Sequence, residues 1–191
     1  MDIVAIGANL VKELRGKTGA GIMECKRALE ETGGSVDKAM DLLRQQGLAK
    51  ADKKSGRQTS QGVIEPYIHG AGRIGAIVEI NCETDFVART ADFKELAHDV
   101  AMQVAATSPR YLSGDVVPEA DFAELEREFG SREKAIEAVC LLDQPFIKDP
   151  KRSIRDLVKS AIAKIGENIQ VRRFSRFEVG AGLPEGDGES A

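Results

Sequence analysis

The sequence is poor in the residues that build catalytic and metal sites. Among its 191 residues it has no tryptophan, two histidines and three cysteines. The cysteines, Cys25, Cys82 and Cys140, are far apart, lack the short paired spacings of a zinc site and lie among apolar neighbours, so we expect buried free thiols. Neither His69 nor His98 stands beside a recognisable nucleophile. The sequence therefore favours a protein that is not an enzyme and that uses no metal and no cofactor.

The chain also lacks a long hydrophobic run and an excess of positive charge. No stretch approaches the roughly 18–20 apolar residues of a membrane span, and the start of the chain lacks the features of a secretory signal, so we expect a cytoplasmic protein without membrane contact. The formal net charge of −4 gives no general attraction to phosphate backbones, so direct nucleic-acid binding is not expected. The length and the 42% hydrophobic content allow one moderate core and one small further domain.

The first fifty residues have the periodicity of three short helices. It predicts a first helix over residues 3–15, a second between the turns at 18–21 and 33–34, and a third from an N-cap at Ser35 to a C-cap at Gly47. The apolar faces of these helices consist of Ile6, Leu10 and Leu14, of Ile22, Cys25 and Leu29, and of Val36, Ala39, Met40 and Leu43. Together the three faces predict a small helical domain.

We assign this domain to residues 1–49 and the next residues, 50–61, to an exposed linker. The linker has one acidic residue, Asp52, and its cations are Lys50, Lys53, Lys54 and Arg57. A basic run of this kind can contact RNA, but in an acidic chain it favours a solvated hinge, into which the third helix can extend by a turn.

Residues 62–179 have the pattern of an α+β domain that begins with a β-hairpin. Strands over 63–69 and 73–82 flank a tight turn at Gly70-Ala71-Gly72. A long amphipathic helix follows and stops before Pro109; its core face consists of Phe93, Leu96, Ala97, Val100, Ala101 and Val104. The sequence thus predicts an antiparallel sheet covered by helices.

The rest of this domain is predicted as helices followed by a final strand. One or two charged helices lie between residues 118 and 139 with a break at Gly130, and a last helix runs from a capping-box-like start at Ser153 to Gly166. A strand over 169–179 completes the sheet, with Ile169, Val171, Phe177 and Val179 expected on one face. The glycine-rich, acidic residues 180–191 are expected to be a disordered tail.

Two short motifs imitate nucleotide-binding sites. Residues 70–75 fit the pattern G-x-G-x-x-G, but a dinucleotide site needs a helix after these glycines, and a strand is predicted there. Gly16-Lys17-Thr18 resembles the end of a phosphate-binding loop, but Val11 stands where that loop requires glycine. The first match is interpreted as a tight turn and the second as chance.

The segment that joins the hairpin to the long helix is the most distinctive one. It contains Thr84, Asp85, Phe86 and Val87. On residue chemistry alone we favour a helical turn capped by Thr84 or Asp85, with Phe86 and Val87 packed into the core. The alternative is an exposed aromatic side chain beside a carboxylate.

Residues 81–89, Asn-Cys-Glu-Thr-Asp-Phe-Val-Ala-Arg, closely resemble the signature of the elongation factor Ts family. Four further segments resemble the same family in the same order: residues 10–15, 18–29, 141–147 and 163–169. The resemblance implies an N-terminal three-helix domain similar to the ubiquitin-associated fold and an α+β core. It also implies the family's short form, with a single core unit and with members thought to act as dimers.

The resemblance further implies a guanine-nucleotide exchange factor for elongation factor Tu, in a complex of two chains of each. The residues that it assigns to gripping the GTPase are Lys12, Arg15, Ile22 and Met23. Those that it assigns to disturbing the Mg²⁺ and phosphate site are Thr84, Asp85, Phe86 and Val87. Tyr67 and His69 are assigned a contact near the phosphate loop of the partner.

The sequence departs from the family pattern at two places. Thr90 stands where the family commonly has asparagine, which bears on a local cap, and the stretch 118–139 is short, which bears on dimer contacts. Two other functions stay open: an adaptor that binds through the three-helix domain, and a nucleotide-binding enzyme built on residues 70–75.

Overall fold

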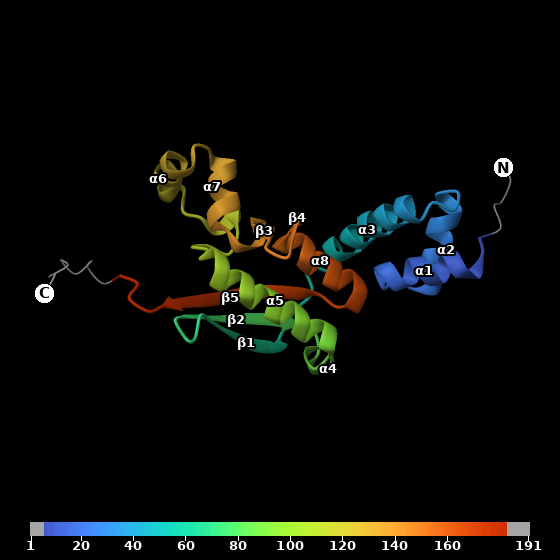
Figure 1. Ribbon diagram of the computed structural model, residues 1–191, viewed down its shortest axis with the longest axis horizontal. Helices are drawn as coiled ribbons and strands as arrows, with labels where there is room; N and C mark the ends of the chain where they lie inside the picture. Colours follow the sequence, from blue (N-terminus) through green and yellow to red (C-terminus); the bar gives the residue numbers. More distant parts are fainter. Residues whose placement is uncertain (1–5, 183–191) are drawn as a thin grey trace, which may run out of the picture. The chain divides into compact units, whose positions relative to one another are not determined.

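The computed structural model describes residues 6–182, and their fold is α+β, as predicted. The start of the first predicted helix and most of the predicted acidic tail lie outside the described residues. The elements in chain order are α1 (Ala8–Thr18), α2 (Ile22–Glu31), α3 (Val36–Asp52), β1 (Gln61–His69), β2 (Ile74–Cys82), α4 (Asp85–Ala88), α5 (Ala91–Thr107), the 3-10 turn η1 (Gly114–Val116), α6 (Glu119–Phe129), α7 (Arg132–Val139), the 3-10 turn η2 (Leu141–Asp143), β3 (Pro145–Phe146), β4 (Asp149–Ser153), α8 (Ile154–Ile165) and β5 (Ile169–Glu178) (Figure 1). Across 6–182, no helix combines the length and the hydropathy needed to cross a bilayer.

The chain forms two compact units, and each is built from separate stretches of sequence. The first, called the helical unit here, contains residues 6–62 together with 81–93 and 155–170. The second, the sheet unit, contains residues 63–80, 94–154 and 171–182. The family signature therefore belongs to the same unit as the N-terminal helices.

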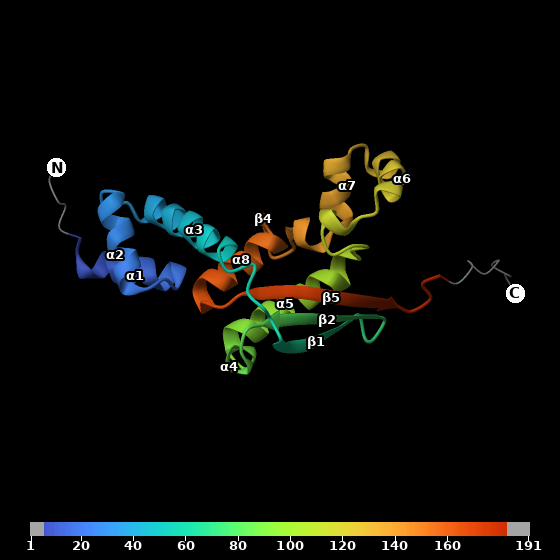
Figure 2. The same cartoon turned by 180° about the vertical axis from the view of Figure 1, so that it is seen from behind.

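The three N-terminal helices lie together (Figure 2) and enclose a core of their own. Its buried residues are Leu14, Cys25, Ala28, Leu29 and Ala39, and Ile6, Leu10, Val36, Met40 and Leu43 pack against them. The first helix begins later than predicted, because Gly7 is extended, with ψ 141°. Its last residue is Thr18, after which Gly19 is left-handed, with φ 68°. Ser35 caps α3 as predicted, since its side chain accepts a hydrogen bond from the Lys38 N–H.

The predicted C-cap at Gly47 is wrong, because α3 continues through this glycine to Asp52. A Cβ atom at Gly47 would lie 3.0 Å from the Cβ of Ala163 in α8, which shows that the glycine permits a close approach of two helices. The first residues of the predicted linker are consequently helical. Lys50 forms an ion pair with Glu24 of α2, and Asp52 forms one with Lys159 of α8 at a distance of 2.7 Å.

The main sheet has three strands in the order β1-β2-β5. All three residues of the predicted turn have left-handed backbone, with φ 59°, 54° and 90° at Gly70, Ala71 and Gly72. The hairpin is therefore confirmed, and no helix follows these glycines as a dinucleotide site would require. The Val179 N–H donates to the Arg73 carbonyl at 2.9 Å, so the end of β5 lies beside the start of β2 and the two strands are antiparallel.

Residues of β5 do not keep the single alternation that the sequence predicts. Ile169 and Val171 are buried as expected, but Phe177 and Val179 are 65% and 59% exposed. The alternation shifts at Arg172 and Arg173, which are both exposed. Both side chains form ion pairs with Glu79 of β2, at 3.5 and 2.6 Å.

One helix, α5, runs along the sheet in both views of the molecule (Figures 1 and 2). Its predicted core face is confirmed, because the side chains from Phe93 to Val104 on that face are all buried. At its end, the Arg176 side chain of β5 donates to the Ala105 carbonyl at 3.0 Å. The sheet unit thus has one face packed against a helix.

Helices α6 and α7 form a separate small cluster in the sheet unit. Gly130 divides them as predicted, in left-handed conformation with φ 87°. Buried side chains of this cluster are Val117, Phe122, Leu125, Ala135, Val139 and Cys140. The Arg132 guanidinium lies 3.5 Å from the centre of the Phe122 ring and also pairs with Glu119 at 2.8 Å.

Candidate functional site

The segment between the hairpin and α5 folds into the four-residue helix α4. Thr84 is its N-cap, and the Thr84 hydroxyl accepts a hydrogen bond from the Val87 N–H at 3.4 Å. Val87 and Ala88 are buried, whereas Phe86 is 82% exposed. The predicted cap and the inward position of Val87 are confirmed, and the predicted packing of Phe86 into the core is wrong. A single helical turn separates neighbouring side chains by about 100°, so one residue of the segment points outward when the next two point inward.

Phe86 is the most exposed large hydrophobic side chain among residues 6–182. Beside it, Asp85 forms an ion pair with Arg89 at 2.7 Å, and both side chains are largely exposed. An exposed pair of this kind adds little to stability. The turn therefore presents an aromatic ring and a carboxylate to solvent, and neither is required by the packing of the chain.

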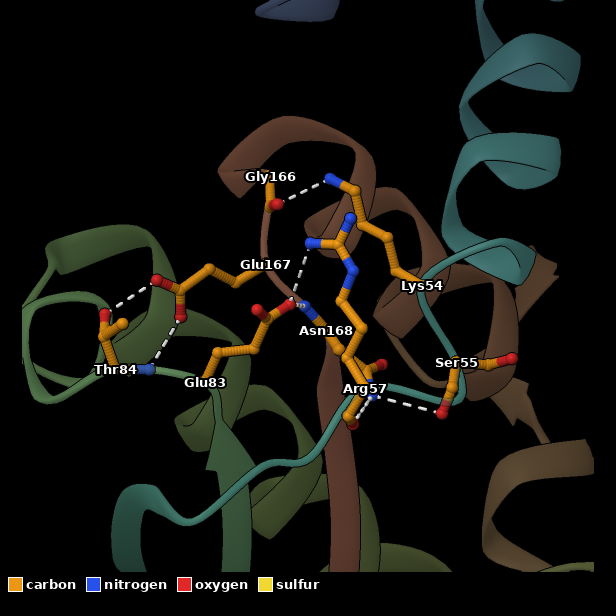
Figure 3. Close-up of polar contacts among 8 residues, drawn as sticks. All are labelled: Lys54, Ser55, Arg57, Glu83, Thr84, Gly166, Glu167 and Asn168. Atoms are coloured by element: carbon orange, nitrogen blue, oxygen red, sulfur yellow. Dashed lines mark hydrogen bonds and ion pairs between the residues drawn. The ribbon is translucent and has the colours of Figure 1, made fainter.

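The turn is joined to the loop after α8 by side chains that the sequence did not single out (Figure 3). The Glu167 carboxylate accepts hydrogen bonds from the Thr84 N–H at 3.0 Å and from the Thr84 hydroxyl at 2.7 Å. The Asn168 N–H donates to the Glu83 carboxylate at 2.6 Å, and Arg57 pairs with the same oxygen at 3.4 Å. The Asn168 hydrogen bond, and to a smaller extent Arg57, hold the pKa of Glu83 below its ordinary value. The only signal in the sequence was the family resemblance of residues 163–169.

The predicted linker is engaged with the same loop. The Asn168 side-chain amide donates to the carbonyls of Ser55 and Arg57 at 3.2 and 2.8 Å, and Lys54 donates to the Gly166 carbonyl at 2.5 Å (Figure 3). Asn168 is 1% exposed. Residues 54–57 are therefore attached to the helical unit, which differs from the solvated hinge that the charge pattern favours.

The cysteines are buried thiols that form no disulfide within residues 6–182, as predicted. Burial raises the pKa of the Cys82 thiol to about 11, so the group is protonated at neutral pH and is not a nucleophile. The Cys82 Sγ donates to the Thr84 carbonyl at 3.1 Å, so the thiol contacts the backbone of the capping residue. Within residues 6–182 there is also no group of three or more His, Cys, Asp or Glu side chains arranged to hold a metal ion.

The predicted gripping residues of the helical domain are on its surface. Lys12 and Arg15 are exposed on α1. Ile22 and Met23 at the start of α2 are 57% and 73% exposed, so Ile22 does not join Cys25 in the core as its spacing predicts. Two neighbouring apolar side chains at a helix start are thus available to a partner.

The sheet unit brings Tyr67 and His69 together with His98, the histidine of α5. The Tyr67 and His69 rings are stacked with centres 6.2 Å apart, and the Tyr67 and His98 rings meet edge to face at 5.4 Å. His98 lies on the polar side of α5 as predicted, and its Nδ1 is 3.3 Å from the Glu65 carboxylate. The His98 ring of α5 therefore packs against the Tyr67 ring of β1.

Comparison with known proteins decides the family. The sequence model described as "Elongation factor TS" matches residues 48–133 and 128–181, which is more than half of the chain. The chain belongs to the elongation factor Ts family. The resemblance seen in five short segments therefore extends over most of the sequence.

Several proteins named elongation factor Ts are similar to this chain over nearly their whole length. The one from Carboxydothermus hydrogenoformans is 52% identical over 93% of this chain and 91% of its own. That of Syntrophomonas wolfei is 52% identical over 93% and 92%, and that of Thermodesulfovibrio yellowstonii is 50% identical over 93% and 98%. This chain is thus similar in length to these elongation factor Ts proteins.

Proposed function

We propose that this chain is the guanine-nucleotide exchange factor of elongation factor Tu, acting in the cytoplasm as a binding protein and not as an enzyme. It binds the GDP complex of the GTPase, disturbs its Mg²⁺ and phosphate site, and releases GDP so that GTP can load. It uses no cofactor and does not bind nucleic acid directly. The observation that carries the proposal is the 82% exposed Phe86 beside Asp85, on a capped turn in a member of this family.

Exchange of this kind follows from linkage. A protein that binds the nucleotide-free GTPase more tightly than the GDP-bound form must weaken GDP binding by the same factor. No covalent chemistry is needed for such a displacement, because it rests on differences in binding free energy alone. The factor therefore has to supply binding energy that is available only when the nucleotide site is distorted.

Phe86 suits this task because its ring is in water in the free protein. Burying a phenylalanine side chain contributes about 1.5–3 kcal/mol, which can offset the separation of two helices in the GTPase. Asp85 stands beside it to hold the displaced element. Displacing Mg²⁺ leaves the GDP phosphates poorly neutralised and favours their release.

The other assigned groups supply the affinity. Lys12, Arg15, Ile22 and Met23 hold the GTPase through the N-terminal helices, and Tyr67 with His69 contacts it near its phosphate loop. Only Thr84 and Val87 of the assigned residues act indirectly, as the cap and the buried anchor of the turn.

The test is the release of a fluorescent GDP analogue from elongation factor Tu. Catalytic amounts of the purified chain should accelerate release at least about a hundredfold, the size of effect expected when differential binding reaches roughly 3 kcal/mol. The chain alone should neither bind nor hydrolyse the nucleotide. Binding of GTP or a dinucleotide by the chain itself would support the enzyme built on residues 70–75, and no acceleration would favour an adaptor.

We also propose that the chain forms a homodimer through the open face of its sheet. Four apolar side chains on this face, Ile64, Ile68, Ile77 and Phe177, are 44–66% exposed. A Cβ atom at Gly75 would lie 3.3 Å from Ile68, and the pairing of Val179 with Arg73 puts Phe177 opposite Gly75. Ile68 and Phe177 therefore share one face, and a second copy is the partner with the same apolar surface.

Replacing Ile68 by glutamate should convert this dimer to a monomer. Each chain of a two-fold dimer carries the substitution once, so it places two unpaired carboxylates in the interface. Sedimentation equilibrium should give twice the 20.6 kDa chain mass for the original protein and one chain mass for the variant. Val116→Glu, at a 55% exposed site on η1, should leave the dimer intact. A monomeric original protein would overturn the proposal.

A further inference from the structure

We infer that Glu167 is the positioning residue of the exchange segment: it holds Thr84 so that the turn carrying Phe86 is ordered before the GTPase binds. The effect of Glu167 on GDP release rests on the proposed function. The ordering of the turn by Glu167 is a property of the free protein and does not depend on that function. It also gives a role to the segment 163–169, which the family resemblance marks without explaining.

The Phe86 turn has little to hold it in place by itself. A helix of four residues is not stable alone, because nucleation fixes several residues for very few hydrogen bonds. Phe86 itself is 82% exposed and contributes no packing. The order of the turn must therefore come from its buried residues, Val87 and Ala88, on one side and from its N-cap on the other.

Glu167 orients the Thr84 hydroxyl that caps the turn. A threonine hydroxyl has a single proton, and this one is donated to Glu167 Oε1 at 2.7 Å. The hydroxyl oxygen is then free to accept from the Val87 N–H. The second carboxylate oxygen, Oε2, accepts from the Thr84 backbone N–H at 3.0 Å. Glu167 thus fixes the backbone and the side chain of Thr84 together (Figure 3).

Glu167 can act in this way because the loop that carries it is itself fixed. Gly166 ends α8 with φ 91°, and its carbonyl accepts a hydrogen bond from Lys54. The next residue, Asn168, is bound through its backbone to Glu83 and through its side chain to the backbone at Ser55 and Arg57. The carboxylate is therefore presented from a rigid support, as an ordered binding group requires.

A measurement in the free protein tests the positioning directly. Because the chain has no tryptophan, Phe86→Trp introduces a single fluorophore at the tip of the turn. Time-resolved anisotropy reports the amplitude of the fast motion of this indole, and adding Glu167→Ala should increase that amplitude measurably because the backbone of the turn is then less ordered. An unchanged amplitude overturns the inference. If Glu167→Ala does not fold, Glu167→Gln replaces it, with a smaller increase expected because one of the two Thr84 donors then faces an amide NH₂.

Exchange assays test the functional consequence. Glu167→Ala should lower the maximal rate of GDP release about fivefold, without changing the factor concentration at half-maximal rate by more than about twofold. In a Phe86→Ala background the same substitution should have no further effect, because there is no ring left to position. Thr84→Val, which removes the hydroxyl, should lower the rate in the same way. Thr84→Ser, which keeps the hydroxyl, should keep the rate of the original protein. A further loss in the Phe86→Ala background would assign Glu167 a general structural role and overturn the inference.

The control removes a comparable carboxylate elsewhere. Glu128 accepts two hydrogen bonds from Arg110, at 2.9 and 2.8 Å, in the cluster of α6 and α7. Glu128→Ala should alter neither the anisotropy nor the exchange rate. If the original protein does not accelerate GDP release, the proposed function fails, and the anisotropy experiment still decides whether Glu167 positions the turn.

Discussion

Replacing Phe86 by alanine is expected to slow the stimulated release of GDP from elongation factor Tu by about ten- to a hundredfold. The estimate follows from the roughly 1.5–3 kcal/mol that burial of the ring can supply and from the roughly 1.4 kcal/mol that corresponds to a tenfold change in rate. Because the ring is 82% exposed in the free chain, its loss leaves no cavity. The free energy of unfolding should change by no more than about 0.5 kcal/mol.

The measurement is stopped-flow release of a fluorescent GDP at saturating factor. The loss should appear in the maximal rate, since the ring acts when the nucleotide site is distorted, and the concentration of factor at half-maximal rate should change less. Val116→Ala, which removes another exposed apolar side chain, should leave both unchanged. A maximal rate within twofold of the original after Phe86→Ala would assign the disturbance of the Mg²⁺ site to another group.

The sequence predicted best the features that depend on neighbouring residues. The cap at Ser35, the tight turn at residues 70–72 and the break at Gly130 each need one residue type in one local conformation, and the structure has all three. The core face of α5 was equally predictable, because a helix of this length repeats its apolar residues over several turns.

Features that depend on distant contacts could not be predicted in this way. Gly47 has the local appearance of a helix end, but α3 continues through it, and the glycine there permits the close approach of Ala163 in α8. Likewise, the expected alternation of β5 assumes an unbroken ladder, and its burial pattern shifts at Arg172 and Arg173, whose side chains both reach Glu79 of another strand.

In the candidate site, too, local features could be predicted from the sequence and long-range contacts could not. Residue chemistry predicted the cap at Thr84 and the inward position of Val87. It placed Phe86 in the core, because periodicity gives no direction to a side chain on a single helical turn. The family resemblance named Phe86 as functional, and the structure adds its exposure. Glu167 was missed because its contact with Thr84 joins residues that are 83 positions apart.

Replacing Met23 by glutamate is expected to produce the opposite kinetic pattern. Met23 is 73% exposed beside Ile22 at the start of α2, and a charge buried there against the GTPase would be unpaired. The dissociation constant for elongation factor Tu should rise by about thirty- to a hundredfold, as a cost of roughly 2–3 kcal/mol implies. The fold should tolerate the change, because an acidic residue in the first turn of a helix is favourable to the helix dipole.

Deletion of residues 1–49 is a weaker test of the same grip, because it cuts α3 inside its helical range and removes the contact of Gly47 with Ala163. The point substitution leaves both intact. Titration of the factor against elongation factor Tu should show the half-maximal concentration rising while the maximal release rate stays within about twofold, and Val116→Glu should change neither. An unchanged half-maximal concentration would remove the start of α2 from the interface, and a fall in the maximal rate would mean that grip and wedge are not separate. The two substitutions together thus distinguish a factor that holds with one surface and distorts with another from one that does both with a single surface.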